Sequence, residues 1–82
     1  VNVTSAVTNI TTTGNATLTL ADGVQGQIKT ITMSTDGGDA VLTPLNRSGY
    51  ATITFNDVGD TVTLQFNNSV WYIIGYRGVV IA

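Results

Sequence analysis

The sequence predicts an all-β domain. Threonine and apolar residues alternate along several segments, turn residues recur between these segments, and β-branched residues dominate throughout. The clearest case is residues 51–66, where apolar side chains occupy every second position on both sides of a break. This pattern predicts a hairpin with arms 50–55 and 61–66, joined through residues 56–60. We therefore expect a small antiparallel β-sandwich or barrel-like domain of six or seven short strands.

The N-terminal part of the sequence predicts two strands after a segment without charged residues. Residues 1–14 fit either a strand or an extended linker, and we favour an extended segment, which leaves residues 15–82 as the β domain. A strand over residues 16–21 ends at the turn signal Asp22-Gly23. The next strand covers residues 27–34, where the apolar phase changes between Ile28 and Ile31 and predicts a bulge or a two-sided strand.

The remaining elements follow from turn residues and apolar runs. The strongest turn signal is residues 36–39, and the strand after it ends at Pro44, which cannot donate to a sheet ladder. Beyond the turn at 46–49 and the hairpin, a last long strand covers residues 70–75. Its continuous apolar run predicts burial on both faces. The apolar tail 79–82 predicts a short final strand.

The size of the chain favours self-association. A single domain of 82 residues buries only about 60% of the surface of its unfolded chain. The sequence has no cysteine for disulfides, and it has neither cysteine nor histidine to hold a metal. With 43% hydrophobic and only 10% charged residues, oligomerisation is the expected source of further burial.

Charge and hydropathy exclude two classes of partner. The net charge is −2, and the three cations are scattered, so the chain lacks the convergent lysines and arginines that bind nucleic acid. No apolar run approaches the roughly 18 residues needed to span a bilayer. Because the sequence opens on Val1 rather than methionine, we expect a processed product or a fragment.

Catalytic residues are not apparent. There is no histidine or cysteine, the serines lie in polar or turn contexts, and Lys29 is the only lysine. We therefore expect no enzyme, no catalytic residue and no cofactor. The aspartate pairs at 36–39 and 57–60 could supply oxygen ligands to calcium, but we interpret them as β-turns, since neither has the spacing of an EF-hand loop.

Large apolar and aromatic side chains are the remaining candidates. For Tyr76, surface recognition and packing are equally favoured. We assign six residues to an oligomer interface or the core and three to surface recognition. The first set is Phe55, Phe66, Trp71, Ile73, Val79 and Ile81, and the second is Tyr50, Tyr76 and Arg77.

The order of these segments resembles a family of β modules. The pieces that carry the resemblance are TLTLADG (17–23), GQIK (26–29), DAVLTP (39–44), ITF (53–55), VGDTVTL (58–64) and WYIIG (71–75). In this order they are similar to the terminal β-domains of phage and large-virus tail fibres, spikes and capsid-associated proteins. The resemblance covers residues 16–75 and is a pattern of strands rather than a catalytic signature.

The resemblance implies a non-enzymatic virion structural module. Such a module trimerises, its strands intertwined or packed against those of its neighbours, and it stabilises or caps a fibre, spike or capsid-associated protein beside other virion proteins. It implies location in the extracellular virus particle, and it implies that residues 1–14 connect to a shaft or a neighbouring subunit. The alternative is a receptor- or glycan-binding head of a viral fibre, whose partner is a host glycan.

Overall fold

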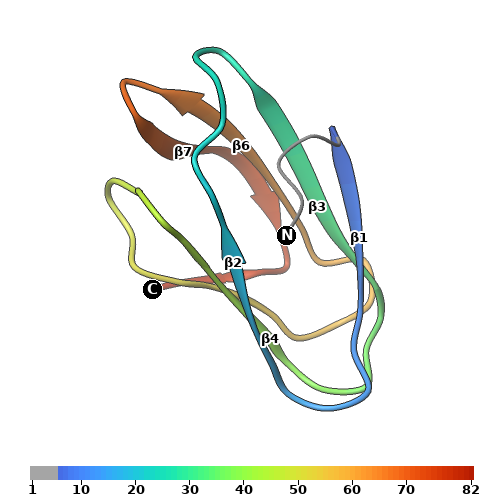
Figure 1. The fold of residues 1–82 in the computed structure, drawn as a ribbon. Helices are drawn as coiled ribbons and strands as arrows, with labels where there is room; N and C mark the ends of the chain where they lie inside the picture. The colour runs from blue at the N-terminus through green and yellow to red at the C-terminus, as the bar shows by residue number, and fades with distance from the viewer. Residues whose placement is uncertain (1–5) are drawn as a thin grey trace.

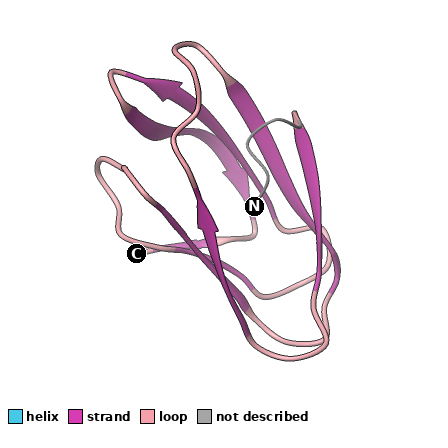
Figure 2. Cartoon of the chain, viewed as in Figure 1, coloured by secondary structure: helices cyan, strands magenta, loops and turns pink. Residues whose placement is uncertain are grey.

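The computed structural model describes residues 6–82, which form eight strands and no helix (Figures 1 and 2). Threonine and β-branched residues fill most of these strands, in agreement with their preference for the pleated, half-buried surface of a sheet. The strands are β1 (Val7–Thr11), β2 (Ala16–Leu20), β3 (Ile28–Thr35), β4 (Ala40–Pro44), β5 (Ile53–Phe55), β6 (Thr61–Asn67), β7 (Val70–Arg77) and β8 (Val80–Ile81).

The strands form two four-stranded sheets with the core between them. The first sheet has the order β1-β3-β6-β7 and the second has the order β2-β4-β5-β8. The predicted all-β, sandwich-like fold is confirmed. The expectation of antiparallel sheets is only partly right, because β1 pairs with β3 and β2 pairs with β4 in parallel.

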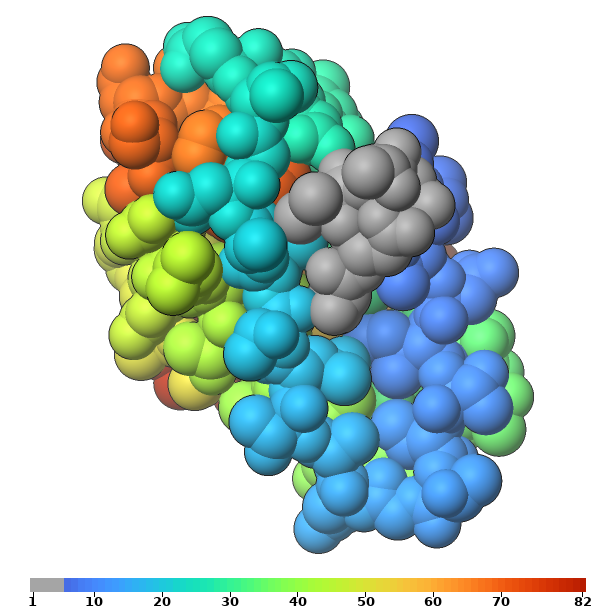
Figure 3. Space-filling model, in the orientation of Figure 1, coloured from blue at the N-terminus to red at the C-terminus, as the bar shows by residue number. Residues whose placement is uncertain are grey.

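Parallel pairing arises because the chain twice crosses from the first sheet to the second. β1 leads into β2 through residues 12–15, and β3 leads into β4 through residues 36–39, so that each pair forms an arch. Figure 1 shows the two connections together at one end of the molecule, and Figure 3 shows the first arch in blue along the face drawn. The arches repeat in sequence: GNATLT at residues 14–19 lies beside GDAVLT at residues 38–43.

The two arch connections are joined by a network centred on Thr12. Its buried hydroxyl donates to the carbonyl of Gly38 at 2.8 Å and accepts from the amide of Gly37 at 3.0 Å. The side-chain oxygen of Asn15 accepts from the amide of Asp39 at 3.0 Å. Turn residues of one arch thus supply the hydrogen-bond partners that the backbone of the other arch needs.

Alternation along the strands selects the core. In β6 the apolar positions are buried and the intervening residues are half-buried. β5 repeats the pattern, as predicted. However, β5 and β6 lie in different sheets, so the predicted hairpin is wrong. The buried apolar residues are Ile10, Leu20, Ile31, Met33, Ala40, Leu42, Ile53, Phe55, Val62, Leu64, Phe66, Trp71 and Val79.

The hairpin of the first sheet is instead β6–β7. Its two-residue turn, Asn68-Ser69, has φ values of 52° and 66°, the left-handed region typical of type I′ hairpin turns. β7 is an edge strand, and the predicted burial of both its faces is not observed within one chain. Tyr72 and Ile74 are exposed, whereas Trp71 is buried.

Two other expectations concern the N-terminal half. β1 falls inside the segment that we favoured as an extended linker, and it belongs to the first sheet. In β3 the phase change corresponds to a two-sided strand, since Ile28 is exposed while Ile31 is buried, and the pairing of β3 with β6 is regular. The first five residues of the predicted linker lie outside the described part.

Substitution of Gly38 by alanine tests the close stacking of the arches. A Cβ at Gly38 would lie 2.3 Å from the carbonyl carbon of Gly14, which is backbone and cannot move aside cheaply. We expect Gly38→Ala to lower the free energy of unfolding by about 2 kcal/mol, as overpacking of a tight site does. Urea unfolding followed by circular dichroism measures this change.

Gly14→Ala is the matched control, because a Cβ at Gly14 meets no atom within 4 Å. We expect this variant to remain within about 0.5 kcal/mol of the parent, as surface substitutions usually do. Equal stability of the two variants would contradict the proposed stacking.

Candidate functional site

The residues predicted for a core or an interface pack within a single chain. Phe55, Phe66, Trp71 and Val79 are buried. Ile73 and Ile81 are partly buried and pack against the same core. Burial in one chain therefore accounts for four of the six predicted positions in full and for Ile73 and Ile81 in part.

Trp71 ties both sheets together at the end of the sandwich opposite the arch connections. Its indole N–H donates to the carbonyl of Ala21 at 2.9 Å, and its backbone amide donates to the carbonyl of Asn46 at 3.0 Å. The indole also packs edge-on against Phe66, with ring centroids 5.2 Å apart. The expectation that a buried Trp71 finds an acceptor for its N–H is confirmed.

Tyr50 is also held by Trp71, through a hydrogen bond. Its hydroxyl donates to the carbonyl of Trp71 at 2.8 Å, which anchors the loop between β4 and β5 against β7. Burial of the phenol raises the pKa of Tyr50 to about 12, although the positive charge of Arg47 acts in the opposite direction. Tyr50 therefore stays neutral, as a hydrogen-bond donor, across physiological pH.

A β-bulge in β7 determines where Tyr76 lies. Leu64 pairs with Ile73 and Thr63 with Gly75, so Ile74 is an extra residue in β7. Beyond this bulge Tyr76 pairs with the buried Val62, which places Tyr76 on the inward face of the strand. Without the extra residue the alternation would bring glycine to this face, so the bulge re-aims an aromatic side chain.

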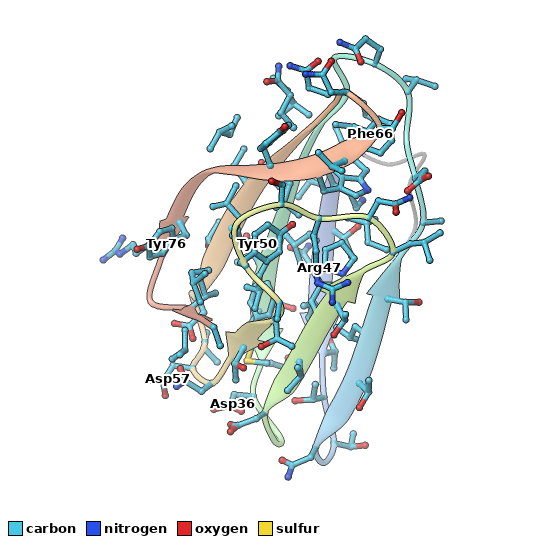
Figure 4. All side chains as sticks on the ribbon, turned by 90° about the vertical axis from the view of Figure 1, so that its left-hand side faces the viewer. Asp36, Arg47, Tyr50, Asp57, Phe66 and Tyr76 are labelled. Atoms are coloured by element: carbon cyan, nitrogen blue, oxygen red, sulfur yellow. The ribbon has the colours of Figure 1, made fainter. Side chains whose placement is uncertain are left out.

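All three tyrosines of the chain line one hollow between β7, β8 and the β4–β5 loop, here called the tyrosine pocket. Figure 4 shows Tyr50 and Tyr76 on the same side of the molecule, between the β7 ribbon and this loop. The pocket has a volume of about 300 Å³. Its lining residues, none of them charged, are Ser48, Gly49, Tyr50, Tyr72, Ile73, Tyr76 and Ile81.

The structure brings together two of the three residues predicted for surface recognition. Tyr50 and Tyr76 line the same pocket, whereas Arg77 is exposed and is not among the lining residues. The predicted set omitted Tyr72, although its aromatic ring was visible in the sequence. Ser48 carried no comparable signal.

Lys29 is a buried cation that sequence reasoning did not place. It alternates along β3 with Ile31 and Met33 and is fully buried, with Nζ donating to the hydroxyl of Thr8 at 2.6 Å. Burial lowers the pKa of the Lys29 ammonium because it disfavours the charged form. Period-two alternation from Ile31 was the signal that could have found it.

The aspartates take part in turns. The carboxylate of Asp60 accepts from the backbone amides of Asn56 and Asp57 at 2.9 and 3.1 Å, which closes the connection between β5 and β6. Nowhere in residues 6–82 do three or more histidine, cysteine or acidic side chains gather as a metal site would require. These contacts agree with the reading of residues 57–60 as a turn.

Comparisons with family models, with curated proteins and with solved structures found no match to this chain. In the part of the chain that is described, no helix has the length and apolar character needed to cross a membrane.

The raised pKa of Tyr50 predicts a loss of stability in alkali. The unfolded phenol ionises near pH 10, whereas the folded phenol holds its proton to about 12. The hydrogen-bonded phenol thus contributes stability that is complete below pH 10 and is lost as the pH rises towards 12. We expect Tyr50→Phe to remove this part of the alkaline decrease in melting temperature.

Tyr76→Phe is the control, because Tyr76 is 61% exposed and its hydroxyl is not tied to Trp71. It should retain the alkaline decrease of the parent. Absorbance titration of the phenolates provides the second measurement, in which the component near pH 12 should be absent only from Tyr50→Phe. An unchanged titration of Tyr50→Phe would contradict the assignment.

Proposed function

We propose that this domain is a non-enzymatic assembly module that forms a homotrimer and stabilises or caps a fibre, spike or capsid-associated protein of a virus particle. The observation that carries the proposal is the distribution of charge. Within the eight strands the charged residues are the buried Lys29 and Arg77 at the last position of β7. Both sheets therefore present outer faces that are free of charge until that last position.

The outer face of the first sheet is the better candidate for the contact between subunits. Two threonine pairs cross its centre, Thr30 with Thr63 and Thr32 with Thr61, each with hydroxyl oxygens 3.3 Å apart. Exposed Val7 and Ile28 lie beside them. We call this surface the first-sheet face, and its members are Val7, Asn9, Ile28, Thr30, Thr32, Thr61, Thr63 and Gln65.

Two physical arguments support association through this face. Interface cores are depleted of charged residues, and so is this face. Soluble β proteins also commonly protect their edge strands with charges, yet β1, β2 and β8 have none and β7 has only Arg77. Three copies that direct the first-sheet face toward a shared axis would cover both the face and its neighbouring edges.

The virion setting is supported by the order of the sequence segments over residues 16–75, which resembles that of terminal β modules in virus structural proteins. That setting supplies the other virion proteins as partners and the particle as the location. Small size supports self-association independently, because one copy of 82 residues buries a limited share of its apolar surface.

A charge placed on the first-sheet face tests the trimer. We expect light scattering to give a mass of about three chains for the parent, and a single-chain mass for Ile28→Lys, because a buried unpaired ammonium is costly. Val58→Lys is the matched control, since Val58 is an exposed aliphatic residue in the β5–β6 connection and lies off this face. It should remain trimeric.

A parent that stays monomeric at every concentration would refute the trimer. Dissociation of both lysine variants would refute the choice of face. Circular dichroism is recorded for the parent and for each variant, so that loss of folding is not mistaken for loss of association.

A receptor- or glycan-binding head is the second candidate function. The tyrosine pocket is the specific observation that favours it, because aromatic rings and hydroxyl groups gather there on an exposed hollow. The pocket opens beside β8 and the β4–β5 loop, and of its lining residues Tyr72, which pairs with Gln65, borders the first-sheet face.

A further inference from the structure

We infer that the tyrosine pocket is a carbohydrate site that takes one uncharged pyranose ring. This inference goes beyond the assembly function, and it gives the second candidate function its class of ligand. It rests on the lining of the pocket, on the rigidity of that lining and on its mixed polarity.

The lining selects against charged ligands. The pocket contains three phenols, one serine, one glycine and two isoleucines, with no lysine, arginine or carboxylate among them. A charged group placed there would lose hydration, and no lining residue would pair with it; Arg47, whose charge reaches Tyr50, lies outside the lining. The ligand that fits is neutral, with an apolar face for the rings and hydroxyl groups for the rim.

A pyranose has this division of polarity. Its C–H bonds form apolar patches on the faces of the ring, and its hydroxyl groups project around the edge. Tyr76, with 61% of its surface exposed, offers an aromatic surface to such a patch. The hydroxyl of Ser48 and the phenols can exchange hydrogen bonds with the edge.

The pocket is held in place without a ligand. Tyr50 is anchored by its hydrogen bond to the carbonyl of Trp71, and Ile73 and Ile81 pack against the core. The bulge at Ile74 sets the direction of Tyr76 through the backbone. Preorganised rings lose little conformational entropy on binding, which matters for a ligand that offers few contacts.

The mixed polarity favours a sugar over a proline-rich peptide. Proline-rich segments bind aromatic grooves in which side-chain donors reach the peptide carbonyls. In this pocket the Tyr50 hydroxyl already donates to the carbonyl of Trp71 and is not available as a donor to peptide carbonyls.

Saturation-transfer NMR on the full chain tests the inference. The probes are the methyl glycosides of glucose, galactose, mannose and N-acetylglucosamine, followed by a glycan array. We expect saturation of the ring protons for at least one probe. We expect Tyr76→Ala to weaken that binding at least tenfold, and Tyr76→Phe to retain it because the ring remains.

Leu45→Ala is the matched control, since Leu45 is an exposed apolar residue that does not line the tyrosine pocket. It should bind as the parent does. Tyr72→Ala provides a second variant within the pocket and should also weaken binding. Because Tyr50 holds its place through the hydrogen bond to Trp71, only Tyr50→Phe is used at that position, and it should weaken binding less than Tyr76→Ala does, since the ring remains.

Each other outcome overturns the inference. Absence of binding to every glycoside and every array glycan refutes the sugar site. Binding of a proline-rich peptide with loss in Tyr76→Ala assigns the pocket to peptides instead. Sugar binding that is unchanged in both alanine variants places the site elsewhere. The mass by light scattering, recorded for each variant, reports on the trimer separately, so the failure of one proposal does not decide the other.

Discussion

Stacking of two arches is the constraint on which the rest of the fold depends. Both connections cross from the first sheet to the second. Pairing of the two arches therefore forms β1–β3 in the first sheet and β2–β4 in the second, and it fixes the register of both pairs. The closeness of the connections leaves room only for glycine at positions 37 and 38, where a Cβ would fall within 3 Å of the backbone of the first arch. Thr12 and Asn15 then accept hydrogen bonds from the backbone amides of Gly37 and Asp39 in the second connection. The sandwich is therefore defined at this end by backbone contact rather than by large side chains.

The opposite end is closed by side chains, and Trp71 is central to it. At this end the loops after β2 and β4 must be held against the first sheet. Trp71 holds both, since its indole and backbone bind the loop after β2 and the loop after β4. Tyr50 is held by the same residue, so the element that closes the core also fixes one wall of the tyrosine pocket. A site built on such an anchor is rigid because the core beneath it is.

Sequence alternation predicts the inward residues well and the strand partners poorly. The arms at 50–55 and 61–66 have the same alternation whether they pair side by side or face each other across a core, so periodicity alone could not separate a hairpin from a sandwich. The repeat of GNATLT and GDAVLT indicates that β2 and β4 are equivalent strands of two similar arches. Only a search for internal similarity reveals this repeat. For the site, aromaticity identified Tyr50 and Tyr76. Their meeting depended on a bulge at Ile74, and a run of four apolar residues gives no sign of which one is extra.

Threonine on the strands and aspartate in the turns together explain why this small domain offers surfaces for contact. The carboxylates lie in the connections, at the ends of the sheets, where turns use aspartate for local hydrogen bonds. The outer faces are left with hydroxyl groups and β-branched carbons, which lose less on desolvation than charges do. Such faces can be buried against another copy at low cost, and the hollow beside them can accept a neutral, hydroxylated ligand for the same reason. Assembly through the first-sheet face and sugar binding in the tyrosine pocket thus follow from one distribution of charge, on two surfaces that meet at Tyr72.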